Sequence, residues 1–174
     1  MNLPENKFMP ETILGIHSNV AGSDGFIDGH AWLTITRDGR TNYYGLWSDD
    51  HELVTGNGDA NGDGSDVRSG YERTYVAVAN RYYKLSAPQA IHFDHLMQAN
   101  VHWRMTNNCS SWASEIVRAV IGEDVDADDN FGFETPRELG RSIQALEARD
   151  PTSFLKPKQV RNDPASSAMS SSSR

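Results

Sequence analysis

Apolar and polar positions alternate along "GHAWLTITRDGRTNYYGLW", a stretch in the first third of the chain. Every second position from 31 to 35 is aliphatic, and this period of two predicts a strand. The dipeptide Asp38-Gly39 is typical of a two-residue turn, and a second strand is expected over 41–47. The pattern therefore predicts a β-hairpin.

Alternation returns in "YERTYVAVANRYYKL", which predicts a third strand over 72–78 that could extend to residue 83. Residues 48–70 are rich in Gly, Asp and Asn, so we expect a long loop between the hairpin and this strand. Residues 1–14 show no regular pattern and are expected to form an irregular lead-in.

A helical period follows. Ser86 and Gln89 fit a capping box, which predicts a helix over about 88–100. In "NNCSSWASEIVRAVIG" the apolar residues recur at the i, i+3, i+4 spacing of a helix buried along one broad face. This second helix is expected to begin at Cys109 and to end before Gly122.

A third helical pattern follows an acidic loop, with Thr135 as its cap and Glu138 closing a second capping box. The order of elements predicts an α+β fold. We expect one domain over residues 15–158, after the lead-in of residues 1–14 and before a disordered Ser-rich tail over 159–174.

Composition narrows the classes of function. The 174 residues carry a net charge of −8 and no basic cluster, which argues against nucleic-acid binding. No stretch is apolar for the roughly 18 residues that a membrane helix needs, so no membrane insertion is expected. The first residues lack the basic and apolar regions of a Sec signal peptide. We therefore expect synthesis in the cytoplasm, and another route if the protein leaves its cell.

Cys109 is the single cysteine of the chain, so it cannot form an internal disulfide or a multi-cysteine zinc site. It is a buried filler, an intermolecular link or a nucleophile. A helix N-terminus lowers the pKa of a cysteine and offers backbone N–H groups to an oxyanion. Asn107 or Asn108 could cap this helix. Asn108, Ser110 and Trp112 are the candidate residues of the oxyanion site and cleft, although packing also explains Trp112.

A nucleophilic cysteine needs a base, usually a histidine. Of the six histidines, His30 is distinctive because it stands at the head of a predicted strand. There it can face the N-terminus of a helix that packs on the sheet. The pair of His30 and Cys109 therefore indicates nucleophilic catalysis, while a structural histidine and a buried cysteine remain the alternatives.

Two motifs carry a resemblance to a known family. "DGHAWLTI", followed by a hairpin and later by "NCSSWASEIV", resembles a circularly permuted papain-like cysteine hydrolase of the NlpC type. In NlpC-type peptidoglycan amidases "D-C-S-G" opens the helix and a "G-H" strand follows. In permuted relatives, including the lecithin:retinol acyltransferase-like group, the histidine strand comes first, as here. The resemblance covers about residues 15–122 and departs at Ser111, where family members carry glycine.

The resemblance implies a papain-like fold, with a small antiparallel sheet packed against the helix that opens with the cysteine. The chain further resembles bacterial type VI secretion amidase effectors, which lack signal peptides and cut peptidoglycan stem peptides. It implies an antibacterial toxin that acts in the target-cell periplasm, with an immunity protein and a secretion-system component as partners. A lipid acyltransferase or thioesterase of the same fold is the alternative, and it predicts an exposed apolar patch near Cys109.

The family usually has a third polar residue that orients the histidine from the neighbouring strand. In the predicted hairpin His30 lies opposite Trp47, so this residue is expected near positions 45–49. We choose Asp49 because a carboxylate orients and stabilises a charged imidazole better than a hydroxyl does. The alternative is that "SDDH" simply begins a solvated loop.

The loop "DANGDGSD" matches the opening half of an EF-hand calcium loop, with Asp59, Asn61 and Asp63 as candidate ligands. The match fails at the twelfth position, where Gly70 replaces the bidentate glutamate. A solvated turn-rich loop is the simpler interpretation, so no cofactor is predicted. A non-catalytic, calcium-dependent binding module remains a third hypothesis.

Overall fold

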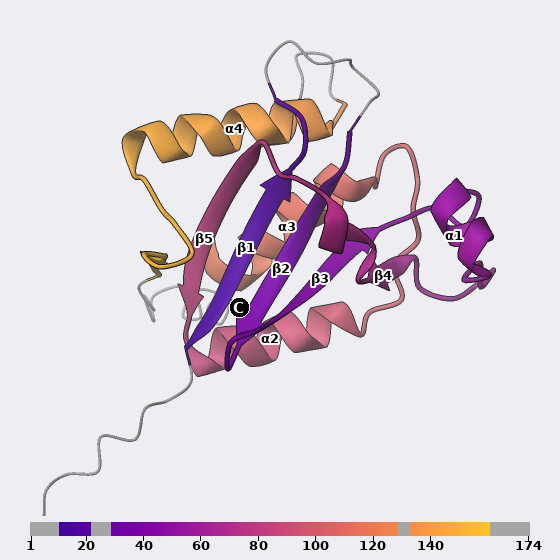
Figure 1. Cartoon of the computed structure of the whole chain (residues 1–174), viewed down its shortest axis with the longest axis horizontal. Helices are drawn as coiled ribbons and strands as arrows, with labels where there is room; N and C mark the ends of the chain where they lie inside the picture. The colour runs from indigo at the N-terminus through magenta and orange to yellow at the C-terminus, as the bar shows by residue number, and fades with distance from the viewer. Residues whose placement is uncertain (1–10, 22–28, 129–132, 161–174) are drawn as a thin grey trace, which may run out of the picture.

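The computed structural model describes residues 11–21, 29–128 and 133–160, which form an α+β fold (Figure 1). The strands are β1 (Thr12–Ser18), β2 (Ala31–Arg37), β3 (Arg40–Leu46), β4 (Val67–Ser69), β5 (Ala79–Leu85) and β6 (Lys158–Gln159). The α-helices are α1 (Glu52–Asn57), α2 (Ala87–Met97), α3 (Cys109–Ile121) and α4 (Pro136–Arg149), and η1 (Tyr71–Thr74) is a 3-10 helix.

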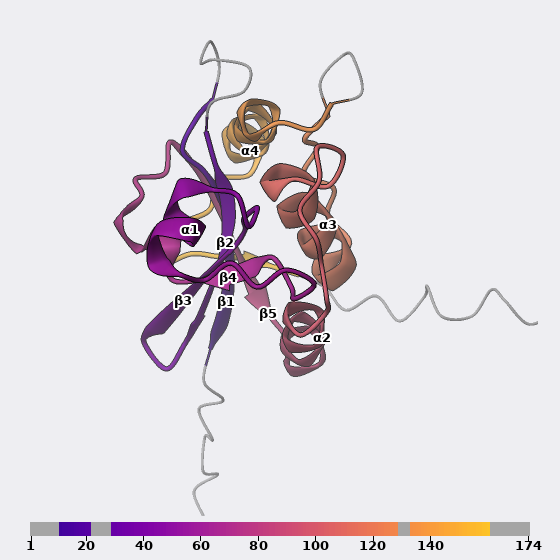
Figure 2. The same cartoon turned by 90° about the vertical axis from the view of Figure 1, so that its right-hand side faces the viewer.

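One sheet contains the six strands of the described residues, in the order β4-β3-β2-β1-β5-β6. Every neighbouring pair is antiparallel except β5 and β6, which run parallel, so the sheet is mixed. Helices α2, α3 and α4 lie on one side of it (Figure 2). The predicted α+β class is confirmed, and the predicted antiparallel sheet holds for all strands but β6.

The predicted hairpin is confirmed as β2 and β3, with Arg37 paired to Arg40. Asp38 has φ 51° and Gly39 has φ 72°, the two positive values that a tight type I′ turn requires. A short turn fixes the register of both strands. Leu33 and Ile35 therefore face the helices and are buried in the core.

The first strand was not predicted. β1 begins at Thr12, so the expected irregular lead-in to residue 14 overlaps a strand that pairs with both β2 and β5. Leu14 and Ile16 are fully buried against the helices, while Gly15 and His17 occupy the other face. A central strand is covered on both faces, and the glycine and histidine interrupted the apolar pattern that would have indicated it.

The predicted strand over 72–78 is wrong over its whole length, and only its possible extension to residue 83 overlaps a strand. Residues 71–74 form η1, and the strand runs from Ala79 to Leu85. Both segments alternate, so the period alone could not place the strand. Arg81 points to the buried face of β5 with no exposed surface, which hides the apolar period of this strand.

The expected long loop over 48–70 contains two short elements, α1 and β4, which the Gly- and Asp-rich composition concealed. The helix opening at Cys109 is confirmed from its first residue to Ile121, with Gly122 as a left-handed cap. The first predicted helix forms one residue earlier than expected and ends at Met97. Thr135 caps α4 as predicted.

The C-terminal boundary differs slightly from the prediction. Residue 159, the first of the predicted tail, belongs to β6, and Val160 packs against the core. Residues 161–174 lie outside the described residues. Within the described part of the chain, no helix has the length and apolar character to cross a membrane.

Candidate active site

Cys109 is the first residue of α3, and Asn108 is the N-cap. The Asn108 side-chain oxygen accepts hydrogen bonds from the backbone N–H of Ser110 at 2.9 Å and of Ser111 at 3.3 Å. The Ser111 hydroxyl in turn accepts from the Asn108 backbone N–H at 2.7 Å, which completes a capping box. The cap holds the thiol at a fixed place at the positive end of the helix.

His30 precedes β2 directly, and its imidazole lies close enough to the Cys109 side chain for each group to shift the pKa of the other. Its Nε2 lies 3.1 Å from a carboxylate oxygen of Glu72. The structure therefore brings together the two residues predicted as nucleophile and base.

Glu72 comes from η1 and is fully buried. One of its oxygens, Oε1, accepts hydrogen bonds from the Trp47 indole N–H at 2.6 Å and from His30. Gly45 makes room for this contact. A Cβ on Gly45 would lie 2.7 Å from both His30 Nε2 and Trp47 Nε1, and would collide with the Glu72 carboxylate.

The charges of this cluster favour an ion pair between Cys109 and His30. Burial alone would lower the pKa of His30, but the Cys109 charge and the hydrogen bonds from Cys109 and Glu72 raise it to about 9. Burial alone would raise the pKa of Cys109, but His30 and the backbone N–H groups of Ala31 and Cys109 lower it below its ordinary value. A thiolate facing an imidazolium is the favoured state between these two pKa values.

Aromatic rings surround the imidazole. The His30 ring centroid lies 4.0 Å from that of Trp47, 6.1 Å from that of Trp32 and 5.9 Å from that of Tyr75. His30 is 6% exposed and Cys109 9%, so little water reaches the pair. In such a site the effective dielectric is low and each charge interaction is stronger than in water.

Asp49, the predicted orienting residue, lies elsewhere. Its carboxylate accepts from the backbone N–H of Gly62 at 2.7 Å and pairs with Arg68. The predicted register was right, because Trp47 does lie beside His30. The carboxylate at His30 is nevertheless that of Glu72, which arrives from η1 rather than from the strand next to β2.

Glu72 was missed because its sequence context, "YERTYV", indicates only an acidic residue among aromatic ones. Nothing in that pattern says that η1 folds back beside β3, although the two elements are in contact. The signal that could have found Glu72 is Gly45, because a glycine within a strand often marks the close approach of another group.

The predicted oxyanion residues have other tasks. The Asn108 side chain caps α3 through its oxygen, and its nitrogen donates to the Glu134 carbonyl at 2.7 Å. The Ser110 N–H is taken by that cap. The groups aimed at the sulfur are instead the backbone N–H groups of Cys109 and Ala31.

Trp112 is 2% exposed and belongs to the hydrophobic core, so packing, the alternative considered for it, is its role in the structure. Its indole nitrogen is buried and has no hydrogen-bond partner among the described residues. Ser110 is fully buried as well. Neither side chain borders open space at the thiol.

The Asp-rich loop is held by contacts within the protein. Asp59 accepts a hydrogen bond from the Tyr71 hydroxyl, and Asn61 accepts one from Arg68 at 3.2 Å. The Arg68 guanidinium also pairs with Asp49, so a side chain of the protein supplies positive charge to this loop. In the described ranges no three or more His, Cys, Asp or Glu residues are grouped to hold a metal ion. These contacts give the calcium interpretation no support.

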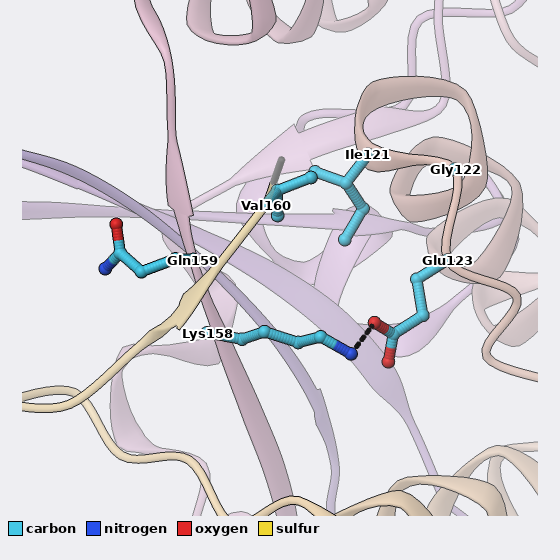
Figure 3. Close-up of a pocket in the computed structure, with 6 residues that line it drawn as sticks. All are labelled: Ile121, Gly122, Glu123, Lys158, Gln159 and Val160. Carbon is cyan, nitrogen blue, oxygen red and sulfur yellow. Dashed lines mark hydrogen bonds and ion pairs between the residues drawn. The ribbon is translucent and has the colours of Figure 1, made fainter. Parts of the chain in front are cut away.

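Neither Cys109 nor His30 lines any of three hollows on the surface of the described residues. One lies at the C-terminal end of α3, where Lys158 and Glu123 pair at 2.6 Å (Figure 3). It is separated from Cys109 by the length of α3, about 18 Å at 1.5 Å per residue. A second adjoins the β2–β3 turn. The third shares Trp32 and Tyr75 with the surroundings of His30.

Comparison of the chain with family models, with curated proteins and with solved structures finds no match.

Proposed function

We propose that this protein is a cysteine hydrolase with Cys109 as nucleophile, His30 as base and Glu72 as the residue that orients His30. The observation that carries the proposal is the chain of contacts from Cys109 through the imidazole to a buried carboxylate. A nucleophile bonded to a base, with the base held by a third group, is the geometry of nucleophilic catalysis.

Each group has a defined step. The Cys109 thiolate attacks the carbonyl carbon of an amide, and the backbone N–H of Cys109 donates to the oxygen as it becomes negative. The His30 imidazolium gives its proton to the leaving amine, the C–N bond breaks and an acyl-enzyme remains. Neutral His30 then takes a proton from water as the water attacks the thioester. The carboxylic acid leaves, and the thiolate–imidazolium pair is restored.

The proposed substrate is an amide bond in a peptidoglycan stem peptide, and the proposed role is that of a secreted antibacterial effector. This part rests on the resemblance of "DGHAWLTI" and "NCSSWASEIV" to permuted NlpC-type enzymes and on the order of the two motifs. The same resemblance suggests a papain-like fold, a secretion-system component for delivery and an immunity protein as partner.

Digestion of purified sacculi tests the proposal. Wild type is expected to create new amino and carboxyl termini in the stem peptides of the sacculi, and Cys109→Ala is expected to create none. Mass spectrometry of the products identifies the bond. Ser114→Ala serves as the matched control, because Ser114 lies on the same helix and its hydroxyl bonds the Val125 carbonyl at 2.7 Å. An undiminished rate in folded Cys109→Ala would overturn the proposal.

A second candidate is a lipid acyltransferase or thioesterase with the same catalytic residues. The observation in its favour is apolar surface beside the cap of α3. Met105 is 74% exposed and Phe133 48%, and the Asn108 side-chain nitrogen donates to the carbonyls of Met105 and Glu134. Release of fatty acid from phospholipid or from an acyl thioester, with sacculi left unchanged, would favour this candidate over the amidase.

A further inference from the structure

The face of the sheet opposite helices α2, α3 and α4 contains a hollow of about 420 Å³, within the size range of small-ligand sites. Four neighbouring strands contribute to it, together with the segment after η1 and one residue of the C-terminal segment. Its lining residues are His17, Trp32, Thr34, Thr36, Thr41, Tyr43, Tyr75, Ala77, Asn80, Tyr82 and Phe154.

Gly15 lies in β1 beneath the His17 and Thr34 side chains, which line the hollow. In the sheet register Gly15 pairs with Thr34 on one side and with Tyr82 on the other. A Cβ at this position would lie 2.6 Å from His17 Nε2 and would collide with the Thr34 hydroxyl. A glycine inside a strand commonly marks a place where another group approaches the backbone closely.

The lining is electrically neutral. It includes no Asp, Glu, Lys or Arg, although the chain has 40 such residues. Burial outweighs the Asn80 hydrogen bond and lowers the pKa of His17 to about 4, so its ring is uncharged at neutral pH. The His17 ring nitrogens lie 2.7 Å from the Asn80 oxygen and 2.8 Å from the Thr34 hydroxyl, which satisfies both. A charged ligand would find no counter-charge here.

Polar groups in the hollow lack partners among the described residues. Asn80 uses its oxygen on His17, but no contact occupies its NH2 group. The hydroxyls of Tyr43, Tyr75 and Tyr82 likewise have no hydrogen bond within the described part of the chain, while their rings present flat apolar surface. Flat rings combined with neutral donors and acceptors match a sugar ring, which has apolar C–H faces and a rim of hydroxyl groups.

We propose that this hollow on the sheet binds a neutral saccharide ring. Phe154, 42% exposed, and Tyr82 form an edge-to-face pair at 6.2 Å that makes one wall. The opposite side adjoins the catalytic centre, because Trp32 and Tyr75 contact both the hollow and the His30 ring. If the proposed hydrolase function holds, the sugar is part of the glycan strand that carries the peptide substrate. The binding itself does not depend on that function.

Titration of 15N-labelled Cys109→Ala protein with chitotetraose, a neutral oligosaccharide of N-acetylglucosamine, tests the proposal without hydrolysis. Amide shifts are expected in β1, β2, β3 and β5 and not in α2. The double variant Tyr43→Phe/Tyr82→Phe removes two hydroxyls and keeps both rings. We expect it to bind about tenfold more weakly, at roughly 0.5–1.5 kcal/mol for each hydrogen bond lost.

Tyr44→Phe is the matched control, because Tyr44 follows Tyr43 in β3 but contacts Phe93 on the helix side. It is expected to bind as the parent does. No saturable binding of chitotetraose, equal binding by the double variant, or tighter binding of a sulfated tetrasaccharide would each overturn the proposal. The two proposals are tested separately, because sacculus digestion by wild type tests the hydrolase function and this titration tests saccharide binding in the hollow.

Discussion

At the scale of the residue, one buried carboxylate determines how His30 behaves. Glu72 has no exposed surface, and Oε1 receives both the Trp47 indole and the imidazole. The second oxygen, Oε2, has no partner among the described residues. Burying a carboxylate in this way costs stability. The buried Glu72 carboxylate offsets this loss of stability with a role at His30, where it orients the imidazole and favours its protonated form.

Asp49 and Glu72 are the two candidates for the carboxylate that orients His30, and replacing each by its amide compares them directly. Glu72→Gln keeps the size of the side chain and removes its charge, so we expect kcat/KM to fall about 10²- to 10⁴-fold. Asp49→Asn is expected to stay near wild type, because Asp49 pairs with Arg68 rather than with His30. Steady-state kinetics of both folded variants on soluble muropeptides is the measurement. Equal losses in the two variants would contradict this assignment.

The pKa values predict a pH profile. The active state needs Cys109 deprotonated and His30 protonated, so kcat/KM should rise as pH passes the lowered pKa of Cys109. It should fall as pH passes about 9, where His30 loses its proton. The rate of iodoacetamide labelling of Cys109, measured against pH, gives the pKa of Cys109 that sets the rise in kcat/KM. His30→Ala should move the labelling pKa up. A wild-type labelling pKa at or above the ordinary thiol value of about 8.5 would rule out the ion pair.

At the scale of the element, the site is made where three short segments meet. Helix α3 supplies the thiol, the head of β2 the imidazole and η1 the carboxylate. The hairpin turn sets the register of β2 against β3, which places Gly45 and Trp47 beside His30. A strand position without a side chain is needed there, because η1 inserts its glutamate at that point.

Gly45→Ala tests this close approach. The new methyl group would displace the Glu72 carboxylate from His30, so we expect at least a tenfold loss of kcat/KM. Overpacking should also destabilise the fold by about 1–3 kcal/mol. Gly56→Ala is the control, since a Cβ in α1 meets open space and should gain up to about 1 kcal/mol of helix stability. Thermal unfolding and kinetics are the measurements, and unchanged activity in Gly45→Ala would show that the site has room to spare.

At the scale of the whole molecule, Arg81 ties strand β5, which lies next to the edge strand β6, to helix α4 and the end of α3. It has no exposed surface and pairs with Glu123 at 2.9 Å and with Glu147 at 2.7 Å, and it donates to the Asp150 carbonyl at 2.8 Å. Glu123 follows α3, Glu147 lies in the second half of α4, and Asp150 is the C-terminal cap of α4. Cys109, His30 and Glu72 are not among the partners of Arg81.

Arg81→Met should therefore destabilise the protein without altering the site. Leaving carboxylates without their buried partner costs about 3–5 kcal/mol. Arg37→Met is the matched control: Arg37 pairs with Asp94 at 2.9 Å near the surface, where such pairs contribute about 0–1 kcal/mol. Urea unfolding measures both. Similar losses for the two variants, or a changed labelling pKa of Cys109 in folded Arg81→Met, would contradict this division of roles.

The sequence by itself determined the local structure near the site. The Asp38-Gly39 turn fixed the hairpin and its register, and the cap at Asn108 fixed the start of α3. Both depend on neighbouring residues alone, since turn geometry and helix capping act over a few positions. For the same reason Cys109 and His30 could be proposed from the sequence as nucleophile and base.

Only the tertiary structure decided which carboxylate reaches His30. Asp49 is nearer along the chain, but η1 folds back over Gly45 and brings Glu72 to the imidazole. Tertiary packing also made a central strand of Thr12–Ser18 and buried Arg81 in β5, against the apolar period in both segments. These three outcomes depend on residues distant in sequence, because burial and charge pairing are determined by what packs against a residue as well as by its immediate neighbours.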